Sequence, residues 1–172
     1  MRIWPFRRSR VEEDADRLLA AVRAASRQPA MFGDGRIPDT LQGRFEAVAI
    51  HAGLALFRLR ADDGASDLAQ AFTDRLFREF DAGLREDGVG DTSVSKRMHK
   101  LAGDFYGRVQ AYSAALEADD QTALAAALER NIGLGPTFAG PLAAHAFASA
   151  ERQAGEPFSS MFEIAAWPQF AE

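Results

Sequence analysis

Two apolar ridges at helical spacing, separated by a short charged segment, constrain the fold of this chain more than any other feature. Before the segment, a large apolar residue recurs at every fourth position from Leu68 to Leu84. After it, large apolar residues recur at intervals of three and four from Val94 to Leu116. Such spacing places each set on one face of an amphipathic helix. The sequence therefore predicts two helices that meet at an elbow, residues 85–93, in an almost entirely α-helical fold.

The elbow carries signals for ending one helix and starting the next. Gly88 suits the left-handed backbone position that ends a helix, and Val89 is then placed to pack back on Leu84. We expect Asp91 or Ser93 to cap the following helix, because either side chain can accept a hydrogen bond from a free backbone N–H.

The rest of the chain also favours helices, and no segment alternates as a strand does. The expected helices cover residues 11–26, 40–60, 66–84, 94–118, 120–131 and 139–153, with loops marked by glycine and proline between them. A chain of this length buries about 70% of its unfolded surface, which is enough for one core. We therefore expect an arm at residues 1–10 and a single helical domain at residues 11–172. The aromatic tail from Gly155 is either strapped over the core or exposed, and strapping is favoured.

Composition and charge narrow the possible classes of protein. Cysteine is absent, which excludes disulfides and thiolate zinc sites. The whole chain has a formal charge of −5, and the first ten residues hold four arginines and no acid, so residues 11–172 carry −9. No apolar run reaches the roughly 20 residues of a membrane span. The expected location is the cytoplasm, with peripheral attachment to the inner membrane left open.

The basic arm interleaves cations with aromatic residues and has three interpretations. It suits contact with an anionic membrane, where arginines meet head groups and Trp lies at the interface, or contact with ribosomal RNA. A frayed terminus fits the same composition. The candidate contact residues are Arg2, Trp4, Phe6, Arg7 and Arg8.

Two blocks of spaced residues carry a family resemblance. The first comprises Pro38-Asp39-Thr40, Gly43-Arg44-Phe45-Glu46, His51 and Leu54. The second comprises Asp81, Leu84-Arg85-Glu86, Gly88-Val89-Gly90-Asp91, Ser93-Val94, Lys96-Arg97, Phe105-Tyr106-Gly107-Arg108 and Ala111-Tyr112. Together these blocks resemble the ubiquinol-cytochrome c chaperone family, the assembly factors of respiratory complex III in alphaproteobacteria and mitochondria. One departure is Asp87, where the family has an apolar residue. A carboxylate at this position indicates that this side of the elbow is more exposed to solvent than in relatives.

The resemblance implies a chaperone that is not an enzyme and needs no cofactor. It implies that the chain receives newly made cytochrome b and holds it until haem and partner subunits are in place. Mitochondrial members of the family also associate with the ribosome near its tunnel exit. The ribosome and the anionic inner-membrane surface are therefore further expected partners, and DNA is not.

A charged surface around the elbow is the candidate contact site. The chain's two lysines lie four residues apart on one helix face, with acidic residues opposite them. An ordinary solvated face explains this pattern equally well. Because the charges coincide with the family blocks, we expect the partner-contact residues to be Asp81, Arg85, Glu86, Asp91, Lys96, Arg97, Lys100, Tyr106 and Arg108. Gly107 within a helix further hints that another segment crosses closely there.

Sequence motifs for catalysis or metal binding are missing. The zincin pair, the phosphate-binding loop and the Gly-x-Ser-x-Gly elbow do not occur. The three histidines lack ligand spacing, and we expect His51 at the rim of the core and His99 in solvent. Two alternatives remain. One is a peripheral membrane protein without an assembly role, and the other is an enzyme whose site gathers Arg44, Glu46, His51, Arg85 and Glu86.

Overall fold

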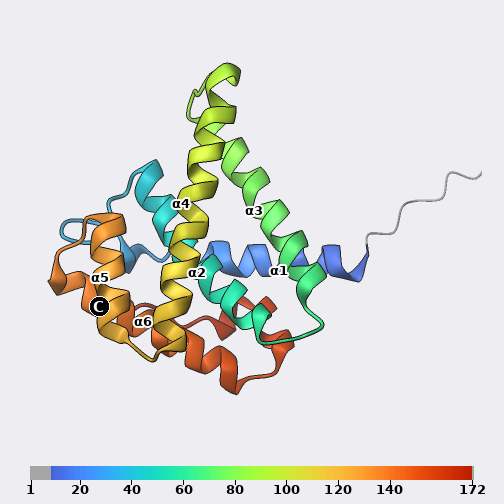
Figure 1. Ribbon diagram of the computed structural model, residues 1–172, viewed down its shortest axis with the longest axis vertical. Coiled ribbons are helices and arrows are strands. Elements are labelled where there is room, and N and C mark those ends of the chain that lie inside the picture. Colours follow the sequence, from blue (N-terminus) through green and yellow to red (C-terminus); the bar gives the residue numbers. More distant parts are fainter. Residues whose placement is uncertain (1–8, 172) are drawn as a thin grey trace, which may run out of the picture.

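The computed structural model describes residues 9–171 and is all-α (Figure 1). Its elements are α1 (Arg10–Ala25), the 3-10 helix η1 (Pro29–Met31), α2 (Leu41–Arg60), α3 (Ser66–Glu86), α4 (Asp91–Glu117), α5 (Gln121–Ile132), α6 (Pro136–Gly155) and the 3-10 helices η2 (Phe158–Phe162) and η3 (Ile164–Ala166). The described residues form no strand, only one isolated bridge between Phe32 and Ile37. None of their helices is long and apolar enough to span a membrane. The predicted fold class is confirmed.

Helix α2 is the centre of the core and contacts each of the other five α-helices. It is apolar almost all round, as expected for a helix buried on every side. Small residues allow its neighbours to approach closely, since Ala47, Ala52 and Ala55 are fully buried. Two of its buried side chains are polar, Glu46 and His51, and each needs a partner inside the protein.

Helices α3 and α4 form an antiparallel hairpin whose elbow projects from the rest of the molecule (Figure 1). Gly88 has a φ of +82°, and the backbone N–H of Val89 donates to the carbonyl of Leu84 at 3.1 Å. The N–H of Gly88 donates to the carbonyl of Arg85, also at 3.1 Å. These two bonds define a Schellman ending, as the sequence predicts.

The predicted cap of the next helix is wrong. Helix α4 begins at Asp91, three residues earlier than expected, and its N-cap residue is Gly90, which has no side chain to accept a bond. Asp91 and Ser93 lie inside the helix instead. Asp91 still stabilises the first turn through its charge, because the helix dipole is positive there. Helix α6 likewise begins three residues early, at Pro136, since proline at the first helical position has a suitable φ and no N–H to satisfy.

An aromatic cluster joins the base of the hairpin to α2. Phe80 lies edge-on to Phe45 with ring centroids 5.3 Å apart, and Phe77 lies edge-on to Phe105 at 5.5 Å. Tyr106 stacks on Phe77 at 5.8 Å and is 54% exposed. Edge-to-face pairs of this kind contribute about 0.5–1.5 kcal/mol beyond their buried area. The cluster therefore fixes the point from which the hairpin projects.

The C-terminal segment, residues 156–171, packs over the core, as the sequence favoured. We call it the strap. Its helices η2 and η3 contact α1, and η2 also contacts α6. The strap buries Met161, Phe162, Trp167 and Phe170.

Glycine has opposite roles at two positions in the family blocks. At Gly107, the predicted close crossing is wrong, because a Cβ there meets nothing within 4 Å. At Gly43, in the first turn of α2, a Cβ would overlap the carbonyl oxygen of Pro38. The chain before α2 folds tightly back at this point, where the Thr40 hydroxyl caps the helix by accepting from the N–H of Gly43 at 3.1 Å.

Alanine at these two glycines should have effects of opposite sign. We expect Gly43→Ala to lower the free energy of unfolding by about 1–3 kcal/mol or more, because the loop must move away from the new methyl group. Gly107→Ala should raise it by up to about 1 kcal/mol, since alanine is the better helix former in open space. Urea unfolding followed by circular dichroism measures both. Equal effects of the two substitutions would contradict the role assigned to Gly43.

Candidate functional site

A groove lies beside the hairpin. It lies between the end of α1, the first turns of α2, the last turns of α3 and the first half of α4, and its volume is about 1260 Å³. We call it the hairpin groove. Its apolar lining includes Leu19, Val22, Leu41, Phe45, Val48, Phe80, Leu84 and Leu101. Its charged lining includes Arg23, Asp39, Arg44, Glu79, Glu86, Asp87, Arg97, Lys100 and Asp104. An apolar surface bounded by charges of both signs is typical of a protein-binding site.

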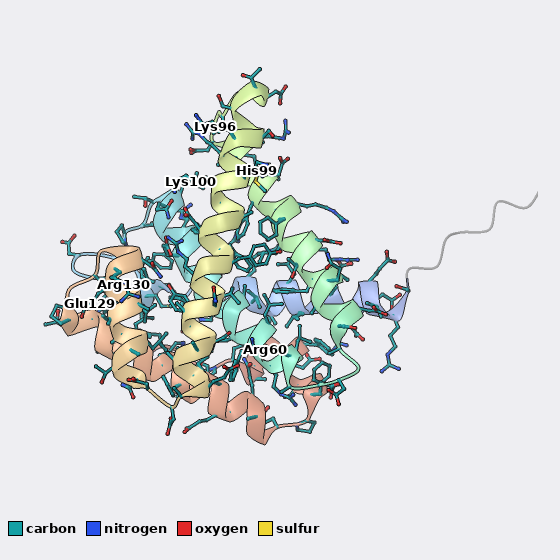
Figure 2. The ribbon with its side chains drawn as sticks, in the orientation of Figure 1. Arg60, Lys96, His99, Lys100, Glu129 and Arg130 are labelled. Atoms are coloured by element: carbon teal, nitrogen blue, oxygen red, sulfur yellow. The ribbon has the colours of Figure 1, made fainter. Side chains whose placement is uncertain are left out.

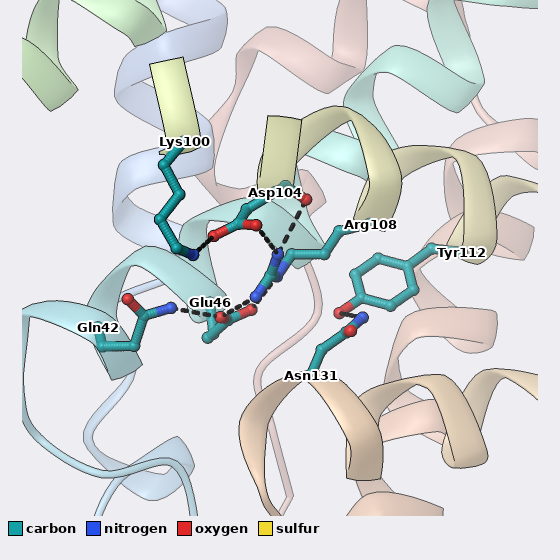
Figure 3. Close-up of polar contacts among 7 residues, drawn as sticks. All are labelled: Gln42, Glu46, Lys100, Asp104, Arg108, Tyr112 and Asn131. Carbon is teal, nitrogen blue, oxygen red and sulfur yellow. Dashed lines mark hydrogen bonds and ion pairs between the residues drawn. The ribbon is translucent and has the colours of Figure 1, made fainter. Parts of the chain in front are cut away.

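A buried ion pair behind the groove holds α2 to α4 (Figure 3). The Glu46 carboxylate accepts two hydrogen bonds from the Arg108 guanidinium, at 2.5 Å and 2.6 Å. The side chain of Glu46 is 1% exposed and that of Arg108 is 11% exposed. Burial alone would lower the pKa of Arg108, but its hydrogen bonds and attraction to Glu46 give a net rise. The pair therefore holds α2 and α4 together from inside the protein.

Other polar groups complete the shell of this ion pair. The Gln42 amide donates to Glu46 at 2.7 Å, and Arg108 donates to the backbone carbonyl of Asp104 at 2.9 Å. Lys100 in turn pairs with the Asp104 carboxylate at 2.6 Å. The Arg108 guanidinium also lies over the ring of Phe45, 5.3 Å from its centroid. The network thus runs from the buried pair to the edge of the hairpin groove.

Arg85 holds the elbow together. Its guanidinium donates to Asp81 on the same helix at 2.7 Å and to Asp91 at the start of α4. The hydrogen bond that Arg85 donates to Asp81 is the largest cause of its raised pKa. All three groups are substantially exposed, so solvent screens these pairs and they add little to stability.

The structure divides the predicted contact residues among different surroundings. Glu86, Arg97 and Lys100 line the hairpin groove, whereas Asp81 and Tyr106 line a separate, open depression between α3 and α4. Lys96 lies exposed near the elbow with His99 and Lys100 on the same projecting part of α4 (Figure 2). Arg85 and Asp91 pair with each other.

Arg108 departs furthest from its predicted role, because its charge is directed inward to Glu46 and little of it reaches the surface. The predicted contacts of the arm, Arg2, Trp4, Phe6, Arg7 and Arg8, lie outside the described residues.

The residues of the enzyme alternative do not converge. Arg44 pairs with Asp39 at 2.8 Å, Glu46 with Arg108, and Arg85 with the carboxylates of the elbow. His51 faces the opposite side of α2, with its ring centroid 5.9 Å from that of His145. Arg44 and Glu86 both line the hairpin groove, but Glu46, His51 and Arg85 are engaged elsewhere, so the five side chains form no common site.

The expected position of His51 at the rim of the core is wrong. Its side chain is 1% exposed, and Nδ1 donates to the Ala47 carbonyl at 2.8 Å. Burial lowers the pKa of His51 to about 4. His99 is exposed, as predicted. No cluster of three or more metal-ligating side chains occurs in the part of the chain that the structure describes.

Sequence reasoning missed the groove itself. Leu41, Val48 and Leu101 belong to three separate turns of helix, and nothing in their spacing shows that they share a surface. The available signal was the agreement between the two family blocks, since Glu46 comes from the first and Arg108 from the second.

Comparison with known proteins supports the family that the two sequence blocks resemble. Residues 34–153 match the family described as ubiquinol-cytochrome C chaperone. The fold is similar to the crystal structure of the Cbp3 homolog from Brucella abortus, with a TM-score of 0.77 and 37% sequence identity over 94% of this chain and 90% of that one. No curated protein sequence matches the chain.

Replacing one member of the buried pair should cost more than replacing both. We expect Glu46→Leu or Arg108→Met to lower the free energy of unfolding by about 3–5 kcal/mol, because each leaves an uncompensated buried charge. The double variant should lose less than the sum of the two. Urea denaturation of all four proteins measures the coupling. Asp81→Asn at the exposed Arg85 pair is the control, because loss of a solvent-screened pair should cost much less than either single change. Additive losses would show that the two side chains act independently.

Proposed function

Because the chain belongs to the ubiquinol-cytochrome c chaperone family, we propose that it assists the assembly of respiratory complex III by binding newly made cytochrome b. It does so as a binding protein and not as an enzyme. The observation that carries the proposal beyond the family is the hairpin groove. Its apolar lining could cover apolar surface of a membrane-protein client before that client is assembled.

The shape and chemistry of the groove suit a helical segment of the client. An amphipathic helix presents one apolar stripe with charges on either side, and helices of this kind commonly bind in apolar grooves. Leu41 is 44% exposed at the groove, so apolar surface is available without rearrangement. Arg97 and Lys100 of α4 and Glu79 and Glu86 of α3 provide charges of both signs that select the orientation of the segment.

The exposed charges of the projecting hairpin extend this contact surface. Lys96 and Arg97 are exposed and form no ion pair with another described residue. Unpaired cations at the edge of an interface steer association with an acidic partner and raise its rate. We place Lys96, Arg97 and Lys100, with Glu86 and Asp91 at the elbow, at the edge of the client interface.

A pair of matched variants tests the groove. Leu41→Ser removes an exposed apolar side chain from the groove, and Ile164→Ser removes one that is 55% exposed on the strap, away from it. We expect Leu41→Ser to lower assembled complex III and cytochrome b haem absorbance several-fold at matched protein levels, and Ile164→Ser to leave both unchanged. Neither should alter folding by more than about 0.5 kcal/mol, since both positions are exposed.

Crosslinking separates the parts of this proposal. A photoreactive residue at position 41 should attach to cytochrome b in cells that make it, and the same residue at position 164 should not. If cytochrome b crosslinks to other positions of the chain but not to position 41, the chaperone role stands and the hairpin groove is not its binding site. Normal complex III in cells that lack the chain would reject the chaperone role.

The arm gives a second, separable test. Residues 1–8 contain three arginines together with Trp4 and Phe6, and we propose that they contact the ribosome or the anionic inner-membrane surface. Each arginine contributes up to about 1 kcal/mol near such a surface. Deletion of residues 1–8 should reduce co-sedimentation with ribosomes or anionic liposomes at low salt and leave the melting temperature unchanged. Equal co-sedimentation would exclude this role, and binding to liposomes with no effect on complex III would favour a peripheral membrane protein.

A further inference from the structure

Two histidines are buried together beneath the strap. His51 on α2 and His145 on α6 have ring centroids 5.9 Å apart, and both side chains are at least nine-tenths buried. The Nε2 atom of each lacks a hydrogen-bond partner among residues 9–171. Rings from the strap cover them, since Trp167 lies 5.9 Å from His51 and Phe170 lies 5.3 Å from His145.

The strap is fastened to the body by few polar contacts. The Gln28 side chain accepts from the backbone N–H of Phe170 at 2.5 Å and donates to the carbonyl of Pro168 at 3.1 Å. Arg17 pairs with Glu163 on the exposed side, and Arg152 reaches the carbonyl of Ala165. The rest of the strap's attachment is apolar: η2 and η3 pack on α1, and the rings of Trp167 and Phe170 pack on the histidines. Segments held in this way open at lower cost than packed helices do.

Charges that could stabilise an imidazolium do not surround the pair. On α6 the titratable neighbour of His51 is His145, which is itself a potential cation. Tyr112 on α4 is neutral, because burial raises its pKa to about 12. Glu46 on α2 is taken by Arg108, and Glu163 of the strap is exposed and paired with Arg17 of α1. A proton on either ring would therefore bring an uncompensated charge into an apolar site.

We infer that the strap is a proton-sensitive latch: protonation of His51 and His145 releases residues 156–171 from α1, α2 and α6 while the six α-helices stay folded. The released state solvates both imidazoles. It also exposes Trp167 and Phe170, together with the apolar surface that they cover. The inference concerns the strap alone and does not depend on the identity of any client.

The direction of the pH dependence follows from burial. Burial lowers the pKa of His51 to about 4 and also lowers the pKa of His145. The open state, where both have ordinary values near 6.5, therefore binds more protons as the pH falls below about 6.5. The closed strap is fully stable above that pH and loses stability as the pH falls toward about 4. For His51 alone, the opening constant rises about tenfold between about pH 7.5 and about pH 5.5.

Hydrogen exchange of the full chain tests this inference directly. Exchange rates are measured by mass spectrometry at several pH values and corrected for the intrinsic rate of each peptide. We expect protection of the strap to fall about tenfold from about pH 7.5 to about pH 5.5, while α4 keeps its protection. Protection of the strap that does not change with pH, or protection of the strap and of α4 that falls together, would overturn the latch.

Histidine variants identify the groups responsible. His145→Gln should reduce the pH dependence of strap exchange, and the exposed His99→Gln should leave it intact. Because a buried substitution can impair folding, a second measurement keeps both histidines. In a Trp4→Phe background Trp167 is the only tryptophan, and its emission should shift to longer wavelength as the pH falls, with the helical circular dichroism signal unchanged. If the Trp167 emission and the helical circular dichroism signal change together at one pH midpoint, the latch is also overturned.

Discussion

The ion pair between Glu46 and Arg108 is the constraint on which the arrangement of the hairpin depends. It fixes the middle of α4 to the beginning of α2 inside the protein, at a point where the aromatic cluster also meets α2. A buried ion pair is a costly fastener, because both charges give up water, but it specifies one register between two helices in a way that apolar contacts do not. The hairpin therefore leaves the core at one defined place.

The hairpin groove is a consequence of that placement. Arg108 fixes α4 to the core, and α3 runs antiparallel beside α4. The last turns of α3 and the first turns of α4 therefore stand clear of the core and form one wall. The end of α1 and the start of α2 form the other. The tight turn at Gly43 sets where α2 starts, so a close backbone contact and a buried ion pair together determine the shape of the site.

The sequence predicts the helices well and the site only in part. Apolar periodicity decides α3 and α4, and the glycine at position 88 decides the end of α3, because these are local effects. Helix starts are less accurate, since α4 and α6 begin, at Asp91 and Pro136, without a side-chain cap. The roles of Arg108 and His51 were not accessible, because a charged or polar residue in a helix looks the same in sequence whether it faces water or a partner 62 positions away. The misassignment of Gly107 has the same origin, since only coordinates show which glycine has a neighbour.

The projecting hairpin also behaves as a lever. From Phe105 in the aromatic cluster to the start of α4 at Asp91, the helix is about 20 Å long at 1.5 Å per residue. A tilt of about 10° at the cluster would carry the elbow by about 4 Å over that length. A small repacking of a few aromatic rings would thereby change the width of the groove by several ångströms while the core kept its packing.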